Sequence, residues 1–354
     1  MRVAVIAITR NGALLGRRLQ DGLTGAKLYV SSRYAGQGGK GCYCFGPAEI
    51  KSQIVSIWKE YDGFVFIMAS GIVVRMIAPL LESKESDPAV VVMDEAGKFA
   101  ISLLSCHLGG ANELAERCAF ASGARPVITT ATDANDLPSF DMLAKENGWL
   151  IDDISQVKHL NTLLLDNLEI AVVDQSGVTR TWLHGRGKVK FHETFSEAAD
   201  SRAHGFLFVT NRDLPPKIQP DKLLLLRPRN LVLGIGCNRG TPADEIEAFV
   251  ASHLKRIFLS RKSICCVASV AAKCDEAGLV EYAARLGVPL RFFASDELNR
   301  IDFPSPPSAH ALAAVGASGV AEPSAILASN GGKLLLKKVK SENVTLAVAE
   351  ICLT

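Results

Sequence analysis

The chain lacks an excess of charge of either sign and has few aromatic residues. Its 354 residues include 39 Lys and Arg against 37 Asp and Glu, which gives a net charge of +2 at pH 7. This balance argues against a basic nucleic-acid-binding surface and against an acidic tail. Only 6% of the residues are aromatic and 21% are charged, whereas 48% are hydrophobic. Such a composition excludes a disordered scaffold and predicts an α/β protein built on short buried strands.

Long apolar runs and paired cysteines are also missing. No window approaches the roughly 18 apolar residues of a membrane-spanning helix, and the first residues lack the pattern of a secretory signal. The nine cysteines include no Cys-x-x-Cys pair, so neither a disulfide framework nor a zinc ribbon is indicated. Cys42 and Cys44, one residue apart, are predicted to bind no metal. We therefore expect a cytoplasmic protein with reduced thiols and no membrane partner.

The order of strand-like and helical segments predicts a multi-domain α/β protein. Residues 1–132 and 229–354 each alternate strands with helices, which is typical of three-layer α/β/α domains with largely parallel sheets. Residues 133–228 are less regular and contain the proline-rich stretch 211–230, so we expect a smaller α/β middle segment and linker there. The clearest expected strands are 2–8, 64–69, 89–93, 99–104, 231–235, 264–269, 289–292 and 347–350, and the clearest expected helices are 47–60, 110–121, 243–257 and 276–286.

Small and polar residues follow several predicted strands, which is where open α/β sheets bind ligands. Gly71 lies in a strand-to-helix turn, and Arg75 follows one helical turn later, where it could clamp a carboxylate. A tight turn with a surface arginine is the alternative. Asp94 and Glu95 precede Gly97 and are typical of a hairpin tip. Because adjacent strand residues point to opposite faces, these two acids need not share one site.

The most informative loop joins the strand 99–104 to the next helix. Two glycines open that helix and are expected to expose its first N–H donors to a negatively charged ligand. His107, beside them, is suited to acid–base chemistry near neutral pH, although a loop histidine is more often structural. The surrounding sequence is not a Gly-x-Ser-x-Gly elbow, so a serine hydrolase is not indicated. The candidate residues are Ser105, His107, Gly109, Gly110, Asn112 and Glu113.

A second glycine-rich loop opens the C-terminal part. Its G-x-G-x-x-x-G spacing is one residue longer than the dinucleotide fingerprint, and the acidic residue expected about 20 residues later is missing. Anion binding with Arg239 is therefore favoured over nicotinamide binding. Thr241 is expected to cap the next helix, with Pro242 at its first position. The candidate residues in this part are Gly236, Asn238, Arg239, Lys273, Asp275, Glu276 and Glu322.

Several of these segments resemble one family, in that family's order. The similarity is to the CbiG proteins of cobalamin biosynthesis, the cobalt-precorrin-5A hydrolases, whose C-terminal region is shared with a stand-alone protein of the aerobic pathway. Cys106 stands where the family usually has Gly, and the middle of the chain matches loosely. The N-terminal matches are residues 71–81, 87–97 and 102–115, and the C-terminal matches are 231–247, 268–279 and 319–327.

The resemblance implies opening of the δ-lactone of cobalt-precorrin-5A and release of acetaldehyde, which gives cobalt-precorrin-5B. This chemistry needs an activated water, a stabilised tetrahedral oxyanion and a proton acceptor for the carbon–carbon cleavage. We expect His107 or Glu95 as the base and backbone N–H groups around Gly109 and Gly110 as oxyanion donors. The expected clamps for the acetate and propionate arms are Arg75 and Arg239.

The resemblance also implies that cobalt arrives within the substrate, so we expect no cofactor of the protein's own and no protein metal site. Beyond the cobalt tetrapyrrole, neighbouring corrin-pathway methyltransferases and a second copy of the chain are open as partners. Because a macrocycle is too wide for one loop, the loops 70–75, 105–113, 234–240 and 273–276 are expected to line one cleft. A non-catalytic tetrapyrrole-binding or channelling protein and a dinucleotide-dependent oxidoreductase are the alternatives.

Overall fold

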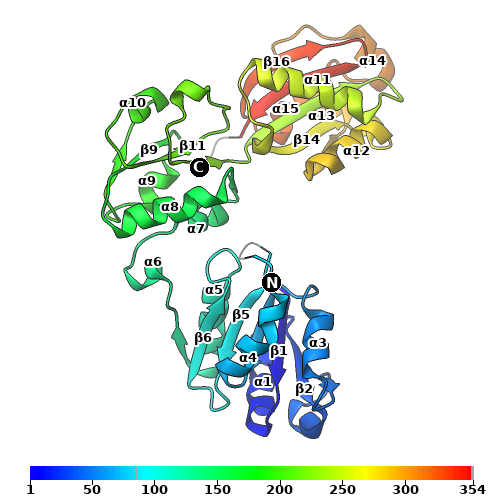
Figure 1. Cartoon of the computed structure of the whole chain (residues 1–354). Helices are drawn as coiled ribbons and strands as arrows, with labels where there is room; N and C mark the ends of the chain where they lie inside the picture. The colour runs from blue at the N-terminus through cyan, green and yellow to red at the C-terminus, as the bar shows by residue number, and fades with distance from the viewer. Residues whose placement is uncertain (84–85, 352–354) are drawn as a thin grey trace. The chain divides into compact units, whose positions relative to one another are not determined.

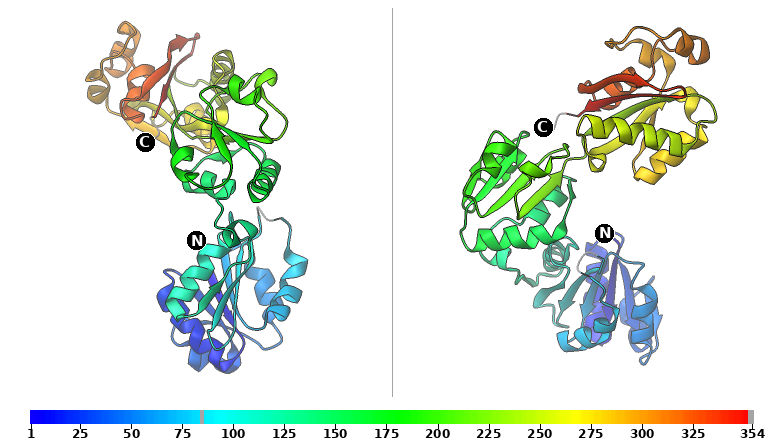
Figure 2. Two further views of the ribbon diagram at one scale, coloured as in Figure 1. Left: turned by 90° about the vertical axis from the view of Figure 1, so that its left-hand side faces the viewer. Right: turned by 45° about the horizontal axis from the view of Figure 1, so that its top comes forward.

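The computed structural model describes residues 1–83 and 86–351, which form two compact units (Figure 1). The first unit is Met1–Leu137 and the second begins at Pro138. One sheet lies in the first unit and two lie in the second, and helices pack on the sheets (Figures 1 and 2). The predicted α/β fold class is therefore confirmed, whereas the predicted boundaries at residues 132 and 228 stay predictions. Within the described ranges no helix has the length and hydropathy needed to span a bilayer.

The first unit is built on a seven-stranded sheet with the order β3-β2-β1-β4-β5-β6-β7. Its strands are β1 (Val3–Ala7), β2 (Lys27–Ser31), β3 (Tyr43–Phe45), β4 (Gly63–Ile67), β5 (Ala89–Met93), β6 (Phe99–Leu104) and β7 (Arg125–Val127). Its helices are α1 (Arg10–Gly22), α2 (Ala35–Gly38), α3 (Ile50–Ile57), α4 (Ser70–Ile77), α5 (Ala111–Ser122) and α6 (Ala131–Ala134).

Helices cover both faces of this sheet because its central strands are apolar on both sides. Val5 of β1 belongs to a core shared with Leu19 of α1 and Leu114 of α5. Its neighbour Ile6 points the other way, into a core shared with Ile54 of α3 and Val73 of α4. This alternation follows from the two-residue period of a strand. The result is the three-layer arrangement expected from the sequence.

A hairpin turns β6 against the direction of β5. The Asp94 carboxylate accepts hydrogen bonds from the N–H groups of Ala96, Lys98 and Phe99, and Gly97 has a positive φ of 68°. The predicted hairpin tip is thus confirmed. Because β6 runs antiparallel to β5, it ends at the edge of the sheet where β4 and β5 begin. The carboxyl ends of β4 and β5 lie at the opposite edge.

The second unit begins with a five-stranded sheet with the order β10-β9-β11-β12-β8. From β9 the chain passes to β10 on one side and then returns to β11 on the other, so the connections change direction between β9 and β11. Its strands are β8 (Leu150–Ile151), β9 (Ile170–Asp174), β10 (Val189–Phe191), β11 (Gly205–Val209) and β12 (Leu223–Arg227). Its helices are α7 (Phe140–Glu146), α8 (Ile154–Leu165), α9 (Val178–Trp182) and α10 (Phe195–Ala199).

The last sheet has the order β15-β14-β13-β17-β16, with β16 and β17 antiparallel to their neighbours. The predicted strand 347–350 is part of β17, whereas β16 was not expected. The strands are β13 (Leu231–Cys237), β14 (Ile264–Val270), β15 (Leu290–Phe293), β16 (Lys333–Lys340) and β17 (Val344–Glu350). The helices are α11 (Ala243–Arg256), α12 (Ala277–Leu286), α13 (Ser295–Asn299), α14 (Ala309–Val315) and α15 (Ala321–Ala328).

Candidate functional site

His107, in the loop between β6 and α5, pairs with Asp133 of α6. Its Nε2 lies 2.7 Å from Asp133 Oδ2, and the Thr132 hydroxyl lies 3.3 Å from the same nitrogen. The two side chains are 17% and 42% exposed, so the pair is partly shielded and still reachable from solvent. A carboxylate that holds an imidazole in this way orients the ring and stabilises its protonated form. The pair is therefore able to take and return a proton.

A polar network holds Asp133 in place. Asn112 Nδ2 donates to Asp133 Oδ2 and to Thr130 Oγ1, in both cases at 3.2 Å. The Thr130 hydroxyl also donates to Asp133. The Ser102 hydroxyl donates to Asn112 Oδ1 at 2.7 Å, which anchors the network on β6. Because β6 and β7 are parallel, their carboxyl ends bring these segments together.

Asn112 and His107 were expected at a site, whereas Asp133 and Thr130 were missed. The available signal was the polar pair Thr130 and Asp133 in the segment that follows the short strand ending at Val127. Asp133 was instead assigned to the less regular middle segment, which was expected to hold no site residue. Polar residues after two adjacent parallel strands belong at one edge of the sheet, so this pair could have been placed beside His107.

The start of α5 is not open to an anionic ligand in the way the sequence predicted. The N–H of Gly110 donates to His107 O at 3.0 Å, and those of Ala111 and Asn112 donate to Ser105 O and Cys106 O. The loop satisfies these donors itself, with Ser105 at a positive φ of 55°. Gly110 is therefore unsuited to be an oxyanion donor, and the expectation for this residue is wrong.

Gly109 lies at a tight bend and lines a cavity of about 470 Å³ at the amino ends of β4 and β5. A Cβ atom at this position would lie 2.3 Å from Ser105 Cβ, so only glycine fits. The Ser105 hydroxyl donates to Asp87 O at 2.9 Å, which ties the loop to β5. Trp58 also lines the cavity. The volume of the cavity is in the usual range for small-molecule sites.

Gly71, Arg75 and Glu95 belong to the opposite half of the first unit. Gly71 lies in the first turn of α4, directly after β4, and Glu95 lies in the β5–β6 hairpin. β6 has six residues, which places its two ends about 20 Å apart. The predicted grouping of the loops 70–75 and 105–113 in one cleft is therefore wrong, because the hairpin reverses β6. Arg75 is exposed and donates to Gly71 O at 2.9 Å.

His107 and Glu95, the two expected bases, consequently cannot act on the same atom. Glu95 is exposed at the hairpin, whereas His107 has a carboxylate partner and a cavity beside its loop. Glu113 is also exposed, in the first turn of α5. The geometry favours His107 as the base.

The expected residues after β13 and β14 do come together. Arg239 Nη1 lies 2.9 Å from both carboxylate oxygens of Asp275, and this hydrogen bond lowers the pKa of Asp275. Lys273 Nζ lies 3.1 Å from Glu276 Oε2, and both side chains are buried. Glu276 also accepts from the N–H of Gly240 at 2.7 Å. The exposed Arg239–Asp275 pair can open to a carboxylate ligand, whereas the buried pair holds the two loops together.

The first two glycines of the dinucleotide-like motif lie within β13 and not in a loop, whereas Gly240 lies in the turn that follows. A Cβ at Gly234 would lie 1.9 Å from Ala321 O, and one at Gly236 would lie 2.6 Å from Thr345 Oγ1. These glycines allow α15 and β17 to approach β13 closely. Gly236 is therefore not a ligand-binding loop residue, and the oxidoreductase alternative loses its motif.

Three further expectations concern the ends of α11, α15 and β13. Thr241 does not cap α11, which begins at Ala243 with Pro242 as its N-cap; the Thr241 hydroxyl instead donates to Asn238 O. Asn238 Nδ2 donates to Asn343 Oδ1 at 3.1 Å, which ties its loop to the β16–β17 turn. Glu322 is 1% exposed and accepts from Ser305 and from the N–H of Lys338, so its contacts are those of a residue that anchors neighbouring loops.

Metal-ligating side chains do not gather in the described ranges: no group of three or more His, Cys, Asp or Glu there could hold a metal ion. Cys42 and Cys44 are free thiols, and Cys352 lies outside the described residues. The absence of a resident cofactor stays a prediction.

The fold and site define a multidomain α/β protein with a histidine–aspartate pair at one edge of its first sheet. Three family models match the chain in order: cobalamin synthesis G N-terminal at residues 52–133, cobalamin biosynthesis central region at 138–228, and cobalamin synthesis G C-terminus at 231–349. The chain belongs to the cobalamin synthesis G (CbiG) family, as the resemblance indicated.

Curated relatives agree with this assignment. A protein of Priestia megaterium named cobalt-precorrin-5A hydrolase is 37% identical over 98% of this chain and 94% of its own length. A protein of the same name from Salmonella typhimurium is 33% identical over 81% of this chain and 82% of its own length. Protein CobE of Sinorhizobium sp is 32% identical over 34% of this chain and 79% of its own length.

Proposed function

We propose that this protein is a cobalt-precorrin-5A hydrolase, which opens the δ-lactone of its substrate with water and releases acetaldehyde. Two curated relatives of this name match most of the chain. The observation that carries the catalytic part is the 2.7 Å contact between His107 and Asp133, because it gives the N-terminal family region an oriented acid–base group. The other partners expected from the sequence, the methyltransferases and a second copy of the chain, stay predictions.

In the first step His107 takes a proton from water as the oxygen attacks the lactone carbonyl. The imidazole of His107 accepts this proton, and the contact of Nε2 with Asp133 orients the ring for it. Asp133 stabilises the resulting imidazolium without taking up the proton itself. The tetrahedral oxyanion needs hydrogen-bond donors, and the backbone of Gly109, on the wall of the cavity, supports this role.

The intermediate then collapses with cleavage of the acyl–oxygen bond, which yields a carboxylate on the macrocycle and a free hydroxyl group. Loss of the hydroxyl proton turns its oxygen into the carbonyl oxygen of acetaldehyde as the adjacent carbon–carbon bond breaks. The electron pair of that bond passes into the conjugated macrocycle, which takes up a proton. One water is consumed and one acetaldehyde leaves, so atoms and electrons balance. His107 is the proton carrier for both halves of this sequence.

Arg239 holds a carboxylate arm of the macrocycle in this proposal. Its Nη1 contacts both carboxylate oxygens of Asp275, and a carboxylate arm of the substrate would replace Asp275 in this contact. Both side chains are well exposed, at 65% and 64%, so the exchange needs no unfolding.

Reaction in ¹⁸O-labelled water tests the proposal. We expect one acetaldehyde per cobalt-precorrin-5A consumed and one label in the new carboxylate of the macrocycle, because water attacks the acyl carbon. Unlabelled carboxylate alongside acetaldehyde would contradict the acyl attack. Binding of the tetrapyrrole with no acetaldehyde would support the channelling alternative.

A further inference from the structure

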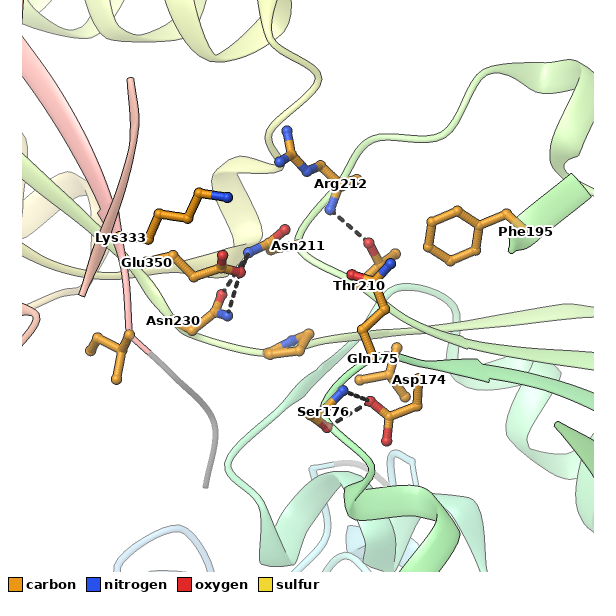
Figure 3. A pocket seen from close by; sticks show the side chains of 13 residues that line it. Asp174, Gln175, Ser176, Phe195, Thr210, Asn211, Arg212, Asn230, Lys333 and Glu350 are labelled. Atoms are coloured by element: carbon orange, nitrogen blue, oxygen red, sulfur yellow. Dashed lines mark hydrogen bonds between the residues drawn. The ribbon is translucent and has the colours of Figure 1, made fainter. Parts of the chain in front are cut away.

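A cavity of about 560 Å³ lies in the second unit, and none of the candidate site residues predicted from the sequence lines it (Figure 3). One wall is formed at the carboxyl ends of β9 and β11, where the strand connections change direction. Such a switch point is the usual ligand position in an open α/β sheet. The other wall comes from Asn230 at the start of β13 and Glu350 at the end of β17.

The Asp174 side of the cavity is rigid, and its carboxylate is fully engaged. Asp174 Oδ1 accepts from the N–H and hydroxyl of Ser176 at 2.9 and 2.6 Å. Asp174 Oδ2 accepts from the N–H and hydroxyl of Thr179, both at 2.8 Å. This acid shapes the loop after β9, and the loop's own N–H and hydroxyl groups occupy both of its oxygens.

The second acid, Glu350, is engaged through one of its two carboxylate oxygens. Its Oε1 accepts from Asn211 Nδ2 at 2.6 Å and from Asn230 Nδ2 at 3.2 Å. Asn211 also donates to Asn230 Oδ1 at 3.0 Å, and the two amides are 7% and 4% exposed. This buried cluster joins the two sheets, so the cavity is preformed.

The two cations of the cavity, in contrast, have no acidic partner. Arg212 donates to Ile257 O at 3.1 Å, which fixes its position. Lys333 stands opposite Glu350 in the β16–β17 ladder and is exposed. Across residues 1–83 and 86–351, neither cation forms an ion pair. The two acids and the two cations of the lining balance in charge, but the cations are not paired with these acids, so each can still pair with a carboxylate of a ligand.

The remaining wall is aromatic. Phe195 faces the cavity on the side away from Lys333 (Figure 3), and its ring packs on Phe208 with centroids 5.2 Å apart. A ligand that suits this arrangement has a flat apolar body and carboxylates at its rim. A simple inorganic anion would use the cations but not the ring.

We propose that this cavity binds the carboxylate-bearing rim of the tetrapyrrole, with Arg212 and Lys333 holding acetate or propionate arms. The proposal rests on the proposed function for the identity of the ligand. The cavity is distinct from the Arg239 loop, because the seven residues of β13 place the two about 20 Å apart. The second unit thus offers carboxylate partners in this cavity in addition to Arg239.

The test is equilibrium binding of cobyrinic acid, a cobalt corrinoid with free carboxylate arms, and of its methyl ester. In the variant R212Q/K333Q we expect the acid to bind at least about tenfold more weakly than in the wild type, since two charge-assisted contacts are lost. The matched control R256Q/K337Q removes an arginine and a lysine that are exposed and lie outside the cavity. It should bind like the wild type, and thermal unfolding should show both variants folded.

Two results would overturn the proposal: unchanged binding of the acid to R212Q/K333Q, or equally tight binding of acid and ester to the wild type. Displacement of the acid by millimolar inorganic phosphate, with no difference between acid and ester, would also overturn it in favour of a general anion site. Acetaldehyde release is measured separately. If acetaldehyde release is absent while the binding differences hold, the proposed function fails and the binding site stands. If acetaldehyde is released but the binding differences are absent, the proposed function stands and the binding site fails.

Discussion

At the scale of single residues, Asp133 decides how His107 can be used. Its carboxylate accepts from His107, Asn112 and Thr130, so it both orients the imidazole and balances the charge that forms there. An asparagine would keep the size of the side chain and lose the charge.

Asp133→Asn should therefore lower kcat by about 10²–10⁴-fold with little change in KM. The matched control is Asp136→Asn, an exposed acid three residues later, which should leave kcat unchanged. Steady-state acetaldehyde kinetics on folded protein measure both. A variant with a raised KM and an unchanged kcat would show that Asp133 positions the substrate and does not orient His107.

Two features of this site could be predicted from the sequence, and two could not. His107 and Asn112 stand in a recognisable strand–loop–helix segment. Asp133 does not, because its partner is 26 residues away and hydrogen bonds at that distance depend on strand order. Gly110 was overvalued for a related reason: the sequence shows a glycine before a helix but not that the loop's own carbonyls occupy the N–H groups.

At the scale of elements, the bend between β6 and α5 fixes the position of the histidine. A Cβ at Gly109 would lie 2.3 Å from Ser105 Cβ and 2.7 Å from Ser105 O, so the loop must shift to accept any other residue.

We expect Gly109→Ala to cost about 1–3 kcal/mol of stability and to lower kcat on the folded fraction, because the His107–Asp133 contact moves. Gly36→Ala is the control, since a Cβ there has nothing within 4 Å. Urea unfolding and acetaldehyde assays measure the two effects. Wild-type stability and turnover in Gly109→Ala would show that the bend is not needed.

The direction of β6 also explains why the prediction of one cleft for the loops 70–75 and 105–113 was wrong. The sequence indicated the hairpin at Asp94 and the strands beside it. A hairpin makes β6 antiparallel to β5, so it places His107 and Gly71 at opposite edges of the sheet. The predicted cleft did not include this consequence of the hairpin.

At the scale of the whole molecule, Asp152 joins the two sheets of the second unit. It lies 2.8 Å from Arg227 Nη2 and 2.7 Å from Lys262 Nζ. Burial by itself opposes ionisation, but the hydrogen bonds and charges of these two cations lower the pKa of Asp152. Arg227 is 4% exposed, so it would be left as a buried charge with only Asp213, at 3.7 Å, as an acidic neighbour.

A carboxyl group whose pKa is lowered by folding stabilises the protein above its unfolded pKa, and this contribution is lost as the pH falls through the folded value. Asp152→Asn should thus be less stable than the wild type by about 1–3 kcal/mol at neutral pH, and the difference should shrink at pH values below about 4. Urea unfolding at both pH values, with the exposed Asp221→Asn as control, measures it. A difference in unfolding free energy between the variant and the wild type that stays constant with pH would show that ionisation of Asp152 does not stabilise the fold.

The cavity of the second unit shows the limit of sequence interpretation at this scale. Its walls come from the loop after β9, the segment 210–212, the residues just before β13, the start of β16 and the end of β17. None of the candidate site residues lies among them, and the cavity exists only because two sheets meet. The α/β class and most strands were accessible from periodicity, whereas a site assembled from distant segments was not.

The most direct test of the account is acetaldehyde release per folded enzyme at saturating cobalt-precorrin-5A, compared between the wild type and His107→Ala. We predict stoichiometric release by the wild type and a rate about 10²–10⁴-fold lower in the variant, with substrate binding retained. His184→Ala, which removes an exposed histidine of the second unit, should match the wild type. A His107→Ala rate within a few-fold of the wild type would contradict the account and leave Glu95 as the next residue to test.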